Sequence, residues 1–152
     1  MLVGYLESDD EGGQFTADGF FRTGDIGRMI DGRYLEITGR RKEIIIRMGE
    51  NISPLEIETV LLQCDAIERV AVVGIPNPRT GERAVAFVTL KPGQSLTFPA
   101  MQDFLARAGL ARQKFPEELH VVDALPTNSI GKILKSELKL IAAGGQAAPA
   151  QR

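Results

Sequence analysis

Three separated segments of the sequence hold residues whose types and spacing suit them to bind a nucleotide or to stabilise negative charge. Asp25 follows a Thr-Gly pair, and a carboxylate at such a tight turn can accept hydrogen bonds from both vicinal hydroxyls of a ribose. Arg40 follows a glycine at a predicted strand end, where a guanidinium can hold a phosphate or a ribose. Lys132 follows a glycine at a predicted helix start, where an ammonium can neutralise a carboxylate or phosphate oxygen.

Each of these residues also has a structural interpretation when it is considered singly. Asp25 can be an ordinary turn aspartate, Arg40 can belong to a solvated charged linker, and Lys132 can be a surface lysine. The segment before Lys132 is not a Walker A loop, because Pro126 stands where that loop needs glycine and Ile133 replaces Ser or Thr. Taken one residue at a time, the sequence leaves both interpretations open.

The elements that would position Asp25 and Arg40 lie in the first 41 residues. Two short apolar runs flank Asp31-Gly32, a dipeptide that tolerates positive φ, and this pattern predicts a β-hairpin. The charged run at 40–43 predicts a domain boundary. Because a lone hairpin is marginal in water, residues 1–41 are expected to be the trailing β segment of another domain.

Residues 42–142 predict an α+β domain, and residues 143–152 predict a loose tail. A capping box is expected at the first helix, with Ser53 as the cap and Glu56 as its partner. Apolar spacing and turn residues predict β segments at 44–46, 70–75, 84–90 and 119–122, a turn at Gly49, and helices after Ser53, from about Phe98 to Gly109, and after Gly131.

Composition and charge exclude several classes of protein. The 152 residues carry a net charge of −2, which argues against nucleic-acid or membrane binding, and no apolar run reaches membrane-spanning length. The one cysteine, Cys64, cannot form an internal disulfide or a zinc site, and no signal peptide is expected, so the predicted location is the cytoplasm. His120 is expected to be structural.

Taken together, the three segments resemble the C-terminal signature of the acyl-CoA synthetase, adenylation-domain and firefly-luciferase superfamily. The resemblance runs from about Gly4 to Lys139, and its longest and most specific part is Tyr34 to Glu58. It implies a small sheet with about three helices, preceded by a hairpin remnant of a large N-terminal domain. Members make an acyl-adenylate from a carboxylic acid and ATP with Mg²⁺, release pyrophosphate, and mostly transfer the acyl group to a thiol.

The details of two segments favour CoA as the acceptor. Residues 47–54 and 129–134 are more similar to acyl-CoA synthetases than to peptide-synthetase adenylation domains, and bacterial fatty-acid or cyclohexanecarboxylate-type CoA ligases are the subtype they resemble. By the same resemblance, Asp25 would bind the ribose hydroxyls of ATP and AMP, and Arg40 would contact the ribose or phosphate side. Lys42 would be the hinge at which the C-terminal domain swings between two orientations.

The resemblance also assigns one segment to each orientation. Lys132 would be the catalytic lysine of the adenylation step, and charge-removing acylation there would regulate the enzyme. Gly49, Glu50 and Asn51 would belong to the loop that replaces it and lines the path of CoA. The two-orientation scheme is physically reasonable, because a lysine over the adenylate would obstruct an approaching thiol.

Several parts of the superfamily pattern are missing from these 152 residues. The phosphate-binding loop, the Thr-Glu segment that holds Mg²⁺ and the acyl pocket all belong to the N-terminal domain, so no metal site is expected here. Alone, the chain is expected to be inactive, as a cloned piece, a proteolytic remnant or a gene fragment. The alternative is a standalone binding or regulatory module that pairs with a separate large domain. A homodimer through strand exchange by residues 1–41 is a further possibility.

Overall fold

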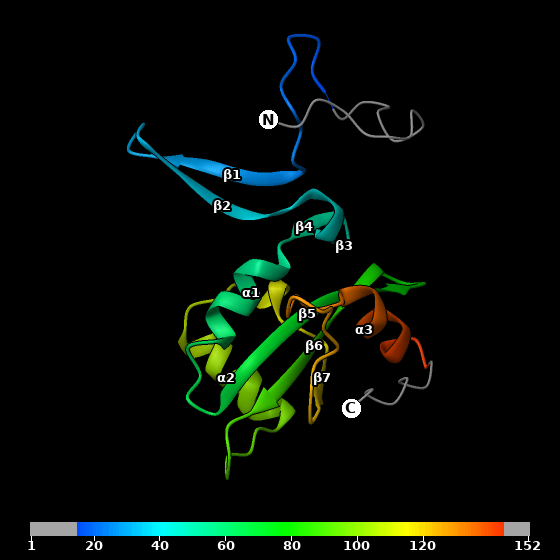
Figure 1. The fold of residues 1–152 in the computed structure, drawn as a ribbon. Helices are drawn as coiled ribbons and strands as arrows, with labels where there is room; N and C mark the ends of the chain where they lie inside the picture. Colours follow the sequence, from blue (N-terminus) through cyan, green and yellow to red (C-terminus); the bar gives the residue numbers. More distant parts are fainter. Residues whose placement is uncertain (1–14, 145–152) are drawn as a thin grey trace. The chain divides into compact units, whose positions relative to one another are not determined.

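The computed structural model describes residues 15–144, so the ends of the chain, including most of the expected tail, lie outside the described residues. The chain divides into two compact units, residues 1–42 and residues 43–152 (Figure 1). No helix within the described part is both long and apolar enough to cross a membrane.

The first unit contains an antiparallel hairpin of β1 (Asp25–Ile30) and β2 (Tyr34–Arg40). The chain turns between them at Asp31 and Gly32, which both have positive φ, at 50° and 63°. The hairpin predicted around this dipeptide is therefore confirmed. Large apolar side chains of both strands are exposed within the unit, including Met29 at 63% and Tyr34 at 66%.

The second unit is built on a five-stranded mixed sheet. Its strands follow the order β4 (Glu50–Ile52), β3 (Ile45–Arg47), β6 (Gly81–Leu90) and β5 (Ile67–Asn77), with β7 (Glu118–Val121) parallel to β6. The long β5–β6 pair is its centre, and β3 and β7 share the other edge of β6. Both strands are longer than the segments predicted at 70–75 and 84–90. β5 also includes residues 67–69 and 76–77, and β6 also includes residues 81–83.

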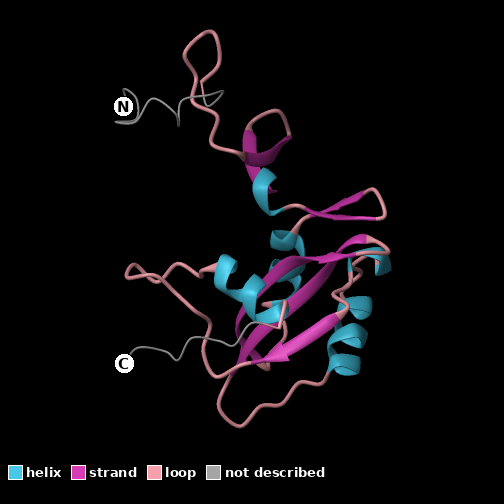
Figure 2. Cartoon of the chain, turned by 90° about the vertical axis from the view of Figure 1, so that its right-hand side faces the viewer, coloured by secondary structure: helices cyan, strands magenta, loops and turns pink. Residues whose placement is uncertain are grey.

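Helices cover both faces of this sheet (Figure 2). They are α1 (Pro54–Leu61), α2 (Phe98–Arg107) and α3 (Lys135–Ala142), with short 3-10 turns at η2 (Arg41–Glu43) and η3 (Arg112–Lys114). On β5, Val70 and Val72 pack into the core with α1 and α2, whereas Ala71 and Val73 pack into the core with α3. A strand buried on both faces has a continuous apolar run, as β5 does. The predicted α+β fold with three helices is confirmed.

The first helix departs from the predicted capping box. Pro54 occupies the first helical turn as expected, but the Ser53 side chain makes no capping hydrogen bond. Glu56 turns instead toward Lys114, whose Nζ lies 2.7 and 2.8 Å from its two carboxylate oxygens. The ion pair therefore occupies the carboxylate that the capping box would have used. Cys64 lies beyond the end of α1 and packs, half-buried, against the core.

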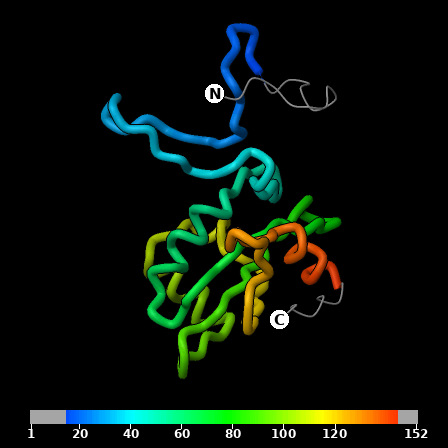
Figure 3. Tube along the Cα trace, viewed as in Figure 1, coloured from blue at the N-terminus to red at the C-terminus, as the bar shows by residue number. Residues whose placement is uncertain are grey.

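The last helix also begins later than the Gly131-Lys132 pair. The chain runs from β7 to α3 through residues 122–134, coloured from yellow to orange in Figure 3, and α3 begins only at Lys135. The expected placement of Lys132 at a helix start is wrong, because the backbone around it closes on itself as a separate loop.

Candidate functional site

The first unit brings Asp25 and Arg40 together. They are partners across the β1–β2 hairpin, and Arg40 Nε lies 2.9 Å from Asp25 Oδ1. The turn before β1 is fixed locally: the Asp25 N–H donates to Thr23 Oγ1 at 3.1 Å, and the Arg41 N–H donates to the Gly24 carbonyl at 2.8 Å. Gly24 has φ +77°, a conformation that glycine adopts without strain.

A hollow of about 370 Å³ opens beside this pair, lined by residues 21–26 and Arg41. The Asp25 side chain is 25% exposed, and an ionised carboxylate has about four acceptor positions, of which Arg40 uses one. The Asp25 carboxylate can therefore still accept hydrogen bonds from a diol while its guanidinium partner holds it in place. The residues present fit the ribose of a nucleotide.

The predicted hinge residue, Lys42, lies in the 3-10 turn η2 and is exposed. It is the last residue of the first unit, and Glu43 is the first residue of the second. Glu43 is tied to the second unit through its side chain, because Lys135 Nζ lies 2.7 Å from Glu43 Oε2. The end of that unit next to Lys42 is thereby fixed.

Gly49, Glu50 and Asn51 lie together on the short β3–β4 hairpin and are all exposed. Arg47 pairs with Glu50, so the turn consists of Met48 and Gly49 alone, with φ of 52° and 82°. Two consecutive residues with positive φ define the type I′ turn, whose twist suits a two-residue hairpin. The turn predicted at Gly49 is confirmed, but a methionine in this conformation is unusual.

Lys132 lies on a second small loop, residues 126–134. Asn128 organises it: its Oδ1 accepts the N–H groups of Ile130 at 3.2 Å and Lys132 at 2.9 Å, and its own N–H donates to the Lys132 carbonyl at 2.9 Å. A bridge between Thr127 and Ile133 closes the loop. Within residues 15–144 the Lys132 ammonium makes no ion pair or hydrogen bond, so a rigid backbone presents an available positive charge.

The base of this loop is fixed by an ion-pair cluster that the sequence interpretation missed. Lys135, at the start of α3, lies 2.7 Å from Glu43 and 2.8 Å from Glu58 Oε1, which also accepts the N–H of Val72 at 2.7 Å. These partners are far apart in the sequence, and no local pattern indicates the cluster. Asn128 was also missed, although Asn is a common turn residue because its side chain can accept the backbone N–H two residues on, as it does here from Ile130.

No metal centre is formed by the described part of the chain. Residues 15–144 contain no group of three or more His, Cys, Asp or Glu side chains placed to hold a metal ion. The first unit therefore offers a carboxylate–guanidinium pair. The second unit offers the exposed Lys132 ammonium and, separately, the exposed β3–β4 hairpin.

The comparisons with known proteins agree on one family. Residues 56–132 match the AMP-binding enzyme C-terminal domain. The chain is 42% identical over 141 residues to the medium-chain fatty-acid–CoA ligase of Escherichia coli (strain K12), covering 91% of this chain and 25% of that protein. It is 40% identical over 139 residues to the 2-succinylbenzoate–CoA ligase of Geobacillus sp. (strain WCH70), covering 91% of this chain and 28% of that protein.

A solved structure is also similar to this chain. ATP-bound MatB from Rhodopseudomonas palustris matches with a TM-score of 0.80 and 32% sequence identity, over 88% of this chain and 26% of that chain. The chain thus spans about a quarter of the length of the relatives it matches.

Proposed function

Because this chain belongs to the AMP-binding enzyme C-terminal domain family, we propose that it works as the C-terminal part of an AMP-forming acyl-CoA synthetase. The overall reaction would convert a carboxylic acid, ATP and CoA into acyl-CoA, AMP and pyrophosphate through an acyl-adenylate. The observation that carries the proposal is the rigid loop that presents the unpaired Lys132 ammonium, in a chain 42% identical to a medium-chain fatty-acid–CoA ligase.

Lys132 would act in the adenylation step. As a carboxylate oxygen bonds to the α-phosphorus and pyrophosphate leaves, two anionic groups are brought together and charge shifts to the phosphoryl and pyrophosphate oxygens. An ammonium between the carboxylate and the α-phosphate would reduce their repulsion and stabilise the transition state. A positioned lysine serves this purpose because the loop around Asn128 fixes its backbone before substrate binds. The Lys132 ammonium has no ion-pair partner among the described residues, so no such pair has to be broken before it contacts the substrates.

Asp25 and Arg40 would bind the nucleotide. The carboxylate would accept both ribose hydroxyls, and the guanidinium would hold the carboxylate in place and face the ribose or phosphate side. ATP would supply the adenylyl group, and Mg²⁺ would be held by the larger part that the relatives contain. Residues 1–41 would belong with that larger part, residues 42–142 would form the mobile domain, and Lys42 would be the hinge between them.

Gly49, Glu50 and Asn51 would act in the second step. In the alternative orientation, the β3–β4 hairpin would take the place of the Lys132 loop and line the path along which the CoA thiol approaches the acyl-adenylate. Gly49 has open space where a side chain would stand, which allows a ligand to approach its backbone closely.

A hybrid enzyme would test this proposal. In it, the present chain replaces the matching C-terminal quarter of the E. coli medium-chain fatty-acid–CoA ligase, and a medium-chain fatty acid is the substrate. We expect carboxylate-dependent ATP–pyrophosphate exchange by the hybrid and none by the present chain alone. Lys132→Ala should lower the exchange by about 100-fold or more, the usual cost of removing one charge-stabilising donor.

Lys139→Ala is the matched control, because Lys139 is exposed on α3 and close in sequence to Lys132. It should leave the exchange unchanged. Exchange by the isolated chain would contradict the proposed division of labour. A hybrid that catalyses neither exchange nor acyl-CoA formation would contradict the proposed function itself.

A further inference from the structure

The β3–β4 hairpin is too small to hold its own position. Each strand has three residues, and the tip is exposed, with Met48 at 80% and Ile46 at 54%. A two-stranded hairpin of this size is marginal in water, so contacts from elsewhere must fix it. Ile45 and Ile52 anchor the base of the hairpin in the core, where they are 0% and 1% exposed. Because β3 pairs with β6 only through Arg47 and Gly81, the position of the tip depends on side-chain contacts.

Glu82 supplies the first of these contacts. Its Oε2 accepts the N–H of Ile46 at 2.7 Å, so a carboxylate continues the hydrogen bonding that the β6 backbone does not provide. The buried Gly74 on β5 leaves the space that this carboxylate fills, because a Cβ there would lie 3.0 Å from Glu82 Oε1. Room for the Glu82 side chain is thus built into the neighbouring strand.

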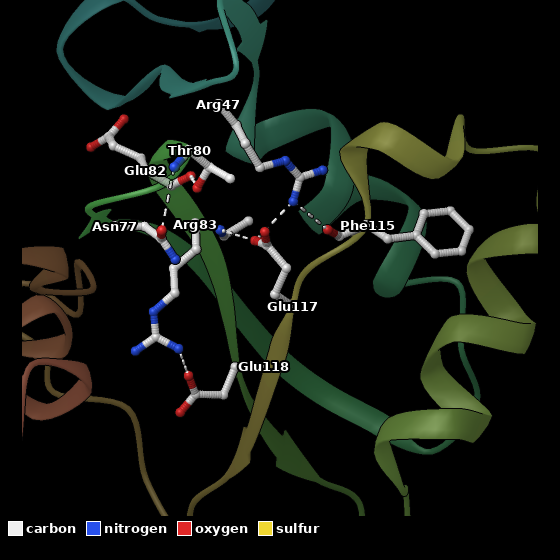
Figure 4. A network of polar contacts seen from close by, with 9 residues as sticks. Arg47, Asn77, Thr80, Glu82, Arg83, Phe115, Glu117 and Glu118 are labelled. Atoms are coloured by element: carbon white, nitrogen blue, oxygen red, sulfur yellow. Dashed lines mark hydrogen bonds and ion pairs between the residues drawn. The ribbon is translucent and has the colours of Figure 1, made fainter.

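The turn between β5 and β6 supplies the second contact. The Met48 N–H donates to the Thr80 carbonyl at 2.8 Å, at the tip of the β3–β4 hairpin. That carbonyl is itself held by the turn around Asn77, whose Oδ1 accepts the N–H of Arg79 at 2.9 Å. The same oxygen accepts the N–H of Thr80 at 3.3 Å (Figure 4). The turn therefore presents a fixed acceptor to the hairpin.

Arg47 supplies the third contact, from the other side. Its side chain is 11% exposed, and its Nη1 lies 2.8 Å from Glu117 Oε2 and 3.1 Å from the Phe115 carbonyl. The same Glu117 oxygen accepts the N–H of Ala84 at 2.7 Å, on β6 just before β7 begins to pair with it (Figure 4). Arg47 and Glu117 thereby join the hairpin to β6 across the gap between β3 and β7.

None of these contacts reaches the loop that carries Lys132. That loop is held by Asn128, by the Lys135 cluster and by Arg69, whose Nη2 donates to the Gly131 carbonyl at 3.4 Å. None of these residues belongs to the set around Glu82 and Arg47. The two proposed half-reactions therefore depend on separate supports within one domain.

We propose that Glu82 and Arg47 are positioning residues for the thiol-transfer step alone, which they serve by fixing the β3–β4 hairpin against the edge of β6. This inference rests on the proposed function, since it assigns the hairpin to the CoA side. It makes the two steps separable by substitutions that contact neither substrate.

The structural part of the inference can be tested on the present chain. Glu82→Ala should speed amide hydrogen exchange at Ile46 and Met48 while the exchange at Lys132 stays unchanged. Gly74→Ala should have the same effect, because its Cβ would lie 3.0 Å from both Glu82 Oε1 and Ile45 Cγ1 and would press on the carboxylate and on β3. Equal acceleration at Lys132, or none at Ile46, would overturn the inference.

The functional part requires the hybrid enzyme and two assays. ATP–pyrophosphate exchange reports adenylation, and single-turnover release of AMP from preformed acyl-adenylate on adding CoA reports thiol transfer. Glu82→Ala should slow thiol transfer by about 10-fold or more and raise the KM for CoA, because small displacements of positioned groups have large kinetic effects. The rate of ATP–pyrophosphate exchange should stay within about 2-fold of the wild type, because the Lys132 loop has separate supports.

Three further variants make the functional result interpretable. Glu82→Gln keeps a carbonyl acceptor and should restore most of the thiol-transfer rate, and Arg47→Lys should lower that rate with normal exchange. Glu68→Ala is the matched control: Glu68 is exposed on β5, and its contact with Thr89 Oγ1 is 3.5 Å long. Equal loss of both half-reactions, or unchanged thiol transfer, would overturn the inference, whereas a wild-type hybrid that lacks both would contradict the proposed function beneath it.

Discussion

The β3–β4 hairpin and the loop at 126–134 are alike in size but are fixed in different ways. The hairpin depends on side chains from distant parts of the chain, because Glu82 and Glu117 reach it from β6 and from the segment before β7. The loop depends mainly on one of its own residues, Asn128, whose side chain accepts two N–H groups. A substitution far away can therefore disturb the hairpin more easily than the loop.

The largest test of this comparison concerns the ion-pair cluster of Lys135 at the base of the loop. Lys135→Ala would leave Glu43 and Glu58 without the cation between them, and the Glu58 side chain is only 14% exposed. We expect unfolding in urea to show a loss of about 2 kcal/mol, because a partly buried carboxylate loses its partner. Lys139→Ala should change the stability by less than about 0.5 kcal/mol. If Lys135→Ala lowered the free energy of unfolding as little as Lys139→Ala does, the ion-pair cluster would not be a support of the loop.

Asn128→Ala tests the local support directly. Two N–H groups of the loop would lose their acceptor, and Lys132 would be presented less precisely. We expect adenylation by the hybrid to fall about 10-fold while thiol transfer from preformed adenylate is unchanged. Asn128→Asp keeps an acceptor oxygen and should recover part of the rate. An equal decrease in both half-reactions would remove the distinction between loop and hairpin.

Met48→Gly addresses strain in the hairpin. A non-glycine residue at φ 52° is disfavoured by about 1 kcal/mol or more, and glycine adopts this conformation freely. The variant should therefore be as stable as the wild type or more stable by up to about 1 kcal/mol in urea unfolding, because relief of strain matches or exceeds the added chain entropy of glycine. Gly49→Ala is the opposite change, at φ 82°, and should lose stability. Stabilisation by both variants would exclude strain as the explanation.

The smallest expected effect concerns pH and the charged cluster next to the hairpin's support. Burial raises the pKa of Glu118, but the hydrogen bonds and charges of His120 and Arg83 together lower it by more. The net pKa of Glu118 is therefore below the ordinary value. The stabilisation is therefore complete above the ordinary pKa of a glutamate and is lost as the pH falls through the lowered value. Glu118→Gln should be less stable than the wild type at pH 7 by about 0.5 kcal/mol or less, and the difference should vanish in acid. A constant difference across pH would contradict this account.

Local patterns were sufficient to predict much of the fold. Asp31-Gly32 predicted a hairpin because both residues tolerate positive φ, and the structure places them there. The apolar run from Val70 predicted a strand, and its unbroken apolar character agrees with the burial of both faces of β5. His120 was expected to be structural, and it stacks on Phe87 at 4.7 Å while its Nε2 contacts Glu118.

The parts that could not be predicted depend on partners far away in the sequence. The capping box failed because Lys114, 58 positions from Glu56, takes that carboxylate. Lys135 and Glu43 are 92 positions apart, and no periodicity or turn signal connects them. The candidate site residues were assigned by resemblance, and their roles remain proposals. Except for Asn128, whose side-chain turn is a local signal, no pattern in the sequence indicated the side chains that hold them.

The closed loop around Lys132 has different consequences for a protease and for an enzyme that acylates lysine side chains. The Lys132 carbonyl accepts the Asn128 N–H at 2.9 Å, so the peptide bond that trypsin would cut is part of a hydrogen-bonded structure although its side chain is exposed. A protease must draw an extended segment into its cleft, which requires this loop to open first. An enzyme that acylates an amine needs only the tip of the side chain. Lys132 is therefore open to chemical modification while the chain around it resists cleavage.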